Sequence, residues 1–168
     1  MTATPPSPAS SAASFDIAQA TRFLRREILG DRARVLVVED DPDCMVCFKH
    51  VFAMTALRRF RAQFVPSVNE ALAIIVMGEV DIAVIDYQLA DGTAADLVRL
   101  WRSYGYELPF IVISGYDDPA HDREMQELGA LGWIAKGSGV TAEELERRIR
   151  YGLGNYWATR CAECPVLK

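Results

Sequence analysis

The feature that most constrains this fold is a regular alternation of short apolar runs with amphipathic stretches, beginning at Arg34. Residues 34–38 (RVLVV), 81–85 (DIAVI) and 109–114 (PFIVIS) are almost entirely apolar and rich in β-branched side chains. Such runs are typical of strands that are covered on both faces. Residues 60–65 and 132–136 are two further strand candidates, and helical spacing is found at residues 42–57, 67–77, 93–105, 119–130 and 141–153.

This order predicts an α/β fold in which a strand–helix unit, (βα), is repeated five times. Strands joined through helices run parallel, the crossovers are right-handed, and the helices cover both faces of a doubly wound sheet. Local signals support several helix starts. Ser67 with Glu70, and Thr141 with Glu144, have the spacing of capping boxes. Pro42 is acceptable in the first turn of its helix.

The chain divides into four predicted segments. Residues 1–14 contain Pro, Ser, Ala and Thr without charge and predict a disordered tail. Residues 15–30 predict an extra N-terminal amphipathic helix, which either packs on its own domain or docks on a partner or second copy. Residues 33–153 hold the main domain. Residues 154–168 form a C-terminal tail for which the pattern predicts no definite structure.

Composition narrows the class of protein. The 168 residues carry a net charge of −5, which disfavours binding to nucleic acid or to an anionic membrane surface. No apolar run is long enough to cross a bilayer, and the N-terminus lacks the pattern of a secretory signal. The four cysteines are therefore expected to be reduced thiols. A cytoplasmic location is predicted.

Polar side chains gather where the predicted strands end. Glu39, Asp40 and Asp41 follow the first strand, Asp86 ends the third, Ser114 ends the fourth and Lys136 the fifth. Ligands of such sheets bind at the carboxyl ends of the strands. Carboxylates that share a crevice repel each other and raise one another's pKa, and Mg²⁺ relieves that repulsion through oxygen ligands. A carboxylate in this setting can act as a nucleophile toward a phosphoryl group.

These residues resemble the response-regulator receiver domain, the CheY-like family of two-component signalling, over residues 33–153. The acidic pair, the strand-end Asp followed by YQLADG, the strand-end Ser and the strand-end Lys occur in the order and spacing of that family. The resemblance implies a flavodoxin-like fold and Mg²⁺ as the cofactor.

The resemblance also implies a role for each matching residue. Asp86 matches the phosphoacceptor, Asp40 the direct Mg²⁺ ligand and Glu39 the acid that acts through metal-bound water. The backbone carbonyl of Gln88 matches a metal ligand, and Lys136 matches the ammonium that pairs with the phosphoryl group. Two residues match the switch: Ser114 is the hydroxyl that moves toward the phosphoryl group, and Trp133 is the switch aromatic. The side chains of Gln88 and Tyr116 match positions that tune dephosphorylation.

The implied function is that of a stand-alone response regulator. It receives a phosphoryl group from a sensor histidine kinase or phosphotransfer protein and assists its own phosphorylation and dephosphorylation, without being an enzyme in the turnover sense. Output is expected through protein–protein contact at the face of the fourth helix, fifth strand and fifth helix. The sequence does not identify the downstream target, and it leaves open whether the protein forms a homodimer.

Two alternatives stay open at this point. One is a receiver-like scaffold that works without phosphorylation. The other is a redox or zinc protein on the same fold, suggested by the pairs Cys44–Cys47 and Cys161–Cys164. Flavin or nucleotide binding is disfavoured, because the acidic stretch EDDPDC after the first strand would repel phosphate without a metal.

Overall fold

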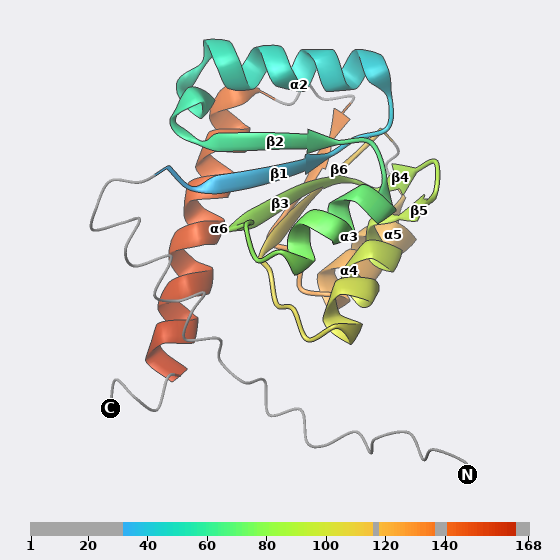
Figure 1. The fold of residues 1–168 in the computed structure, drawn as a ribbon, viewed down its shortest axis with the longest axis vertical. Coiled ribbons are helices and arrows are strands. Elements are labelled where there is room, and N and C mark those ends of the chain that lie inside the picture. The colour runs from blue at the N-terminus through green and yellow to red at the C-terminus, as the bar shows by residue number, and fades with distance from the viewer. Residues whose placement is uncertain (1–31, 116–117, 137–140, 164–168) are drawn as a thin grey trace.

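A five-stranded parallel sheet forms the centre of the computed structural model, which describes residues 32–115, 118–136 and 141–163 (Figure 1). Its strands lie in the order β2-β1-β3-β6-β7. Their bounds are Arg34–Val38 for β1, Arg61–Val65 for β2, Ile82–Asp86 for β3, Phe110–Ser114 for β6 and Trp133–Ala135 for β7. The predicted (βα)5 flavodoxin-like fold is confirmed.

Helices cover both faces of the sheet (Figure 1). They are α2 (Pro42–Met54), the 3-10 turn η1 (Ala56–Arg59), α3 (Val68–Val76), α4 (Ala94–Ser103), α5 (Pro119–Glu127) and α6 (Ala142–Glu163). A short antiparallel hairpin, β4 (Gln88–Leu89) and β5 (Gly92–Thr93), follows β3. The sequence pattern did not predict this hairpin, because two-residue strands are too short to show a period.

The apolar strands divide their side chains between two cores. In β1, Leu36 and Val38 face the core under α3, α4 and α5, whereas Val35 and Val37 face the core under α2 and α6. The same alternation continues through β3 and β6. Because successive side chains of a strand point to opposite faces, an all-apolar strand is what two covered faces require.

Several helix ends differ from the sequence prediction, and those of α2 and α6 have a visible structural reason. The helix that begins at Pro42 ends at Met54, where Thr55 takes an extended conformation and its side chain accepts a hydrogen bond from Leu57 N–H at the start of η1. The last helix continues to Glu163, although Gly152 and Gly154 resemble stop signals. Gly152 instead serves close packing, since a Cβ there would lie 2.7 Å from Leu131 and 3.3 Å from Ile82.

Several predictions fall outside the described residues. They include the tail at 1–14, the helix at 15–30, and residues 164–168. In the part of the chain that the structure describes, no helix has the length and apolar character needed to cross a bilayer.

Candidate functional site

The candidate site lies at the carboxyl ends of four neighbouring strands. Strand pairing aligns Val38 with Ile85, Asp86 with Ile113, and Ser114 with Ala135. Residues that end these strands, or follow them directly, therefore meet at one edge of the sheet. The predicted residues Glu39, Asp40, Asp86, Ser114 and Lys136 all come from this edge.

Three of the acids form a cluster. Glu39, Asp40 and Asp86 each offer a carboxylate oxygen that lies within 4.8 Å of the others. Glu39 is only 1% exposed and Asp86 is 9% exposed, while Asp40 is half-buried. Carboxylates held this close, and this far from water, need compensating positive charge.

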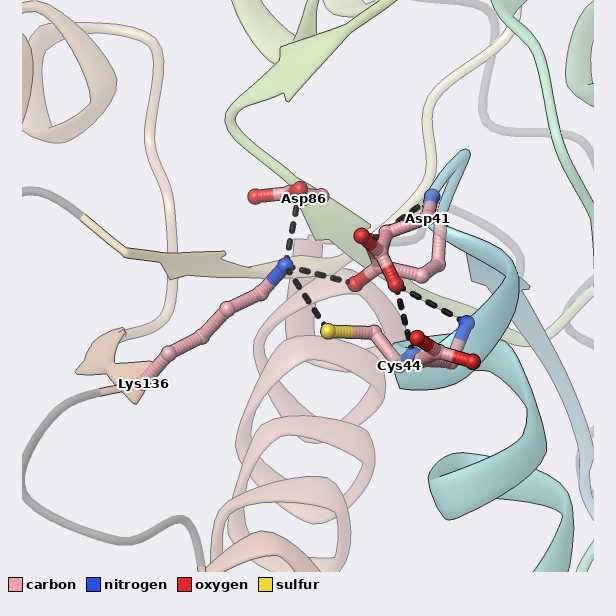
Figure 2. Close-up of polar contacts among 6 residues, drawn as sticks. Asp41, Cys44, Asp86 and Lys136 are labelled. Carbon is pink, nitrogen blue, oxygen red and sulfur yellow. Dashed lines mark hydrogen bonds and ion pairs between the residues drawn. The ribbon is translucent and has the colours of Figure 1, made fainter.

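Lys136 supplies part of that charge. Its Nζ lies 2.8 Å from Asp86 Oδ2 and 2.7 Å from Glu39 Oε2 (Figure 2). Burial disfavours the charged ammonium, but the hydrogen bonds and attraction from Asp86 and Glu39 outweigh burial and raise the pKa of Lys136. The lysine therefore stays protonated and holds one oxygen of Asp86.

Asp41 has a different structural role from Glu39 and Asp40. It is the N-cap of α2, and its Oδ1 accepts hydrogen bonds from Asp43 N–H at 2.9 Å and Cys44 N–H at 2.8 Å. These bonds hold the pKa of the Asp41 carboxyl below its ordinary value. Of the three consecutive acids, the first two belong to the cluster and the third fixes the helix that follows.

The charge balance of the cluster fits a divalent cation. Three carboxylates face one ammonium, which leaves two negative charges. Burial, and then repulsion by Asp86, raise the pKa of Glu39 despite the ion pair with Lys136. Apart from that ion pair, the buried Oε2 of Glu39 has no hydrogen-bond partner among the described residues. Oxygen ligands with surplus negative charge are what Mg²⁺ prefers.

The remaining predicted residues surround the cluster. Ser114 is buried at the end of β6 and follows Ile113, the residue that pairs with Asp86. Trp133 is half-buried in β7, and its ring centroid lies 5.7 Å from that of Tyr87. The side chain of Gln88 is exposed on β4. Tyr116 lies outside the described residues.

Sequence reasoning missed a polar contact next to Asp86. Tyr87 is buried, and its hydroxyl donates a 2.9 Å hydrogen bond to Glu124 Oε2 on α5. Arg99 on α4 binds the other oxygen of Glu124 at 2.7 Å. The Tyr87 ring also stacks on His121, with centroids 4.1 Å apart. No local pattern marks these partners, because they come from three separate elements.

The comparisons with known proteins agree with this geometry. A family model described as the response regulator receiver domain matches residues 35–150. The chain belongs to this family. Members are signalling proteins of two-component systems, and membership implies histidine kinases or phosphotransfer proteins as partners in general.

Relatives at the level of sequence include two acid tolerance regulatory proteins called ActR. The protein from Rhizobium meliloti is 29% identical over 119 residues, and the one from Sinorhizobium medicae is 28% identical over 110 residues. These matches cover 71% and 66% of this chain. The chain spans only 60% and 55% of the length of these relatives.

Solved receiver domains share the fold. The signal receiver domain of a LuxO repressor protein from Vibrio parahaemolyticus has a TM-score of 0.69 at 17% identity, covering 79% of this chain and 98% of that one. A CheY-like receiver domain protein from Methanospirillum hungatei has a TM-score of 0.65 at 21% identity, covering 74% and 95%.

Proposed function

We propose that this receiver domain accepts a phosphoryl group on Asp86 from a histidine kinase or phosphotransfer protein. Mg²⁺ would be held by Asp40, Asp86 and the Gln88 backbone carbonyl, and by Glu39 through metal-bound water. The observation that carries the proposal is the cluster of three acids around Asp86, with Lys136 bonded to Asp86 Oδ2. When bound, Mg²⁺ supplies positive charge that offsets the carboxylates and the phosphoryl oxygens.

The residues of the chain provide the other requirements of the transfer. Because Lys136 holds Oδ2, we assign Oδ1 of Asp86 as the nucleophile that forms the new O–P bond while the P–N bond to the donor histidine breaks. The Lys136 ammonium then pairs with one phosphoryl oxygen, and the Ser114 hydroxyl donates to another. The side chains of Gln88 and Tyr116 are assigned to tuning the later attack by water.

We assign the output to protein–protein contact at the face formed by α5, β7 and α6. Two contacts support a physical link from Asp86 to this face. The adjacent Tyr87 bonds to Glu124 of α5, and its ring lies beside Trp133 of β7. A phosphoryl group adds about two negative charges next to these contacts, which is sufficient to bias a two-state packing equilibrium.

The decisive experiment treats the full chain with acetyl phosphate and Mg²⁺ and locates the modification by intact and peptide mass spectrometry. We expect one phosphoryl group on Asp86, none on the Asp86→Asn variant, and none when Mg²⁺ is chelated. The matched control is Asp43→Asn, which removes an exposed carboxylate close to the site but outside the acidic cluster and should be modified normally.

A phosphorylation-independent scaffold predicts the opposite result. If neither acetyl phosphate nor beryllofluoride with Mg²⁺ changes the chain, or if the Asp86→Asn variant is modified as readily as the native chain, the proposal is wrong. Transfer from a phosphorylated histidine kinase, tested on the same variants, then measures whether a protein donor is used.

A further inference from the structure

Two thiols lie in the first turns of α2, next to the acidic cluster. Cys44 is half-buried and Cys47 is exposed, and both are free thiols. Residues three apart in a helix lie on the same side of it, with Cβ atoms about 5–6 Å apart. The family function does not use this pair, and the sequence spacing alone left redox chemistry open.

Cys44 contacts the site in two ways (Figure 2). Its Sγ lies 4.0 Å from Lys136 Nζ, the same ammonium that binds Asp86 and Glu39. Its backbone N–H donates the 2.8 Å hydrogen bond to Asp41, the residue after Asp40. A change in the position of Cys44 is therefore transmitted both to Lys136 and to the acidic loop.

We propose that Cys44 and Cys47 form a reversible disulfide within α2, and that this disulfide weakens Mg²⁺ binding and slows phosphoryl transfer to Asp86. The effect on phosphoryl transfer rests on the proposed function, whereas the effect on Mg²⁺ binding is measured separately. The chemical partner is a low-molecular-weight disulfide, for which oxidised glutathione is the probe.

The reaction balances without a further reagent. The Cys47 thiolate attacks one sulfur of oxidised glutathione, which forms a mixed disulfide and releases the first glutathione thiolate. Cys44 then loses its proton and attacks the Cys47 sulfur, which forms the internal disulfide and releases the second. Two protein thiols are oxidised and one glutathione disulfide is reduced. Cys47 reacts first because it is exposed, while burial raises the pKa of the Cys44 thiol.

Closing the disulfide must move the start of α2. A disulfide needs Cβ atoms about 3.5–4.5 Å apart, which is closer than the helical spacing of about 5–6 Å. The first turns of α2 have to take up this change in spacing, and they hold the contacts of Cys44 with Lys136 and with Asp41. Loss of such supporting contacts around a metal site typically costs about 10- to 100-fold in metal affinity or activity.

The test uses the full chain with Cys161 and Cys164 replaced by serine, so that only the α2 pair can react. Samples are equilibrated in glutathione buffers of graded redox ratio. Peptide mass spectrometry then identifies the Cys44–Cys47 disulfide, and calorimetry and acetyl phosphate measure Mg²⁺ affinity and the phosphorylation rate. We expect Mg²⁺ affinity and phosphorylation rate to fall about tenfold on oxidation and to return with dithiothreitol. The matched control adds Cys47→Ser, which cannot form the internal disulfide and should keep its Mg²⁺ affinity across the same buffers.

Each outcome decides the inference. No Cys44–Cys47 disulfide at any redox ratio overturns it, as does a disulfide that leaves Mg²⁺ affinity unchanged. If the reduced chain binds Mg²⁺ but takes no phosphoryl group, the proposed function fails while the Mg²⁺ titration still tests the disulfide. If neither redox form binds Mg²⁺, both proposals are wrong.

Discussion

At the scale of single residues, the buried carboxylate of Glu39 carries an electrostatic cost. Its carboxylate is 1% exposed, and burial together with repulsion by Asp86 raises its pKa. Lys136 is its ion-pair partner, but the same ammonium also forms an ion pair with Asp86. Without a bound cation, the negative charge on Glu39 therefore opposes folding. A buried carboxylate is costly when the one ammonium that neutralises it is shared with a second carboxylate.

Glu39→Gln is accordingly expected to stabilise the metal-free protein. The amide keeps an oxygen to accept from Asp41 N–H and removes one buried charge. We expect the free energy of unfolding in chelator to rise by roughly 1 kcal/mol, and the extra stability conferred by Mg²⁺ to shrink. Urea unfolding with and without Mg²⁺ measures both.

The control for this experiment is Glu127→Gln on the exposed surface of α5, which should change stability by less than about 0.5 kcal/mol. A Glu39→Gln protein that is less stable than the native chain in chelator would show that the ion pair with Lys136 outweighs the cost of burial.

At the scale of elements, Tyr87 joins the end of β3 to α5 through Glu124. Burial, followed by the hydrogen bond to Glu124, raises the pKa of Tyr87 to about 12, whereas an unfolded tyrosine titrates near 10. The folded state therefore prefers the neutral phenol. The stability from this preference is fully present below about pH 10 and is lost as the pH rises toward about 12.

The Tyr87→Phe variant should lack this alkaline loss. We expect the native chain to lose on the order of 2 kcal/mol more than the variant between about pH 10 and pH 12, measured as the difference in urea unfolding free energy. Tyr104→Phe is the matched control, because Tyr104 is 63% exposed and should leave the pH profile unchanged. Equal alkaline losses in native chain and Tyr87→Phe would refute the assignment.

At the scale of the whole molecule, α6 packs on the sheet through the buried side chains of Leu145, Ile149 and Leu153 and approaches Leu131 and Ile82 closely at Gly152. A Cβ at Gly152 would meet Leu131 at 2.7 Å and Ile82 at 3.3 Å, whereas nothing lies within 4 Å of the Cβ position at Gly154. Both residues belong to the same helix. Both glycines therefore have a helical backbone, but only the Cβ position of Gly152 is occupied by neighbouring side chains.

Substitutions at these glycines should act in opposite directions. Gly152→Val is expected to lower the free energy of unfolding by about 1–3 kcal/mol through overpacking against the sheet. Gly154→Ala should raise it by about 0.5–1 kcal/mol, because alanine favours the helix and meets no neighbour. Thermal and urea unfolding of both variants measure the effect. A destabilised Gly154→Ala protein, or a tolerated Gly152→Val, would contradict this account of α6.

Much of this molecule follows from the sequence alone. The apolar runs and helical spacings determine the (βα)5 order, because a parallel strand needs a crossover and two covered faces. That order in turn brings Glu39, Asp40, Asp86, Ser114 and Lys136 to one edge, because the carboxyl ends of parallel strands coincide.

Only the tertiary structure decided which of these polar groups contact one another. It separated Asp41, which caps α2, from the acids beside it, and it joined Tyr87 to Glu124 and Cys44 to Lys136. It also showed that Gly152 lets α6 approach the sheet and does not end the helix. These contacts link residues far apart in the chain, and they depend on packing distances that no local sequence period records.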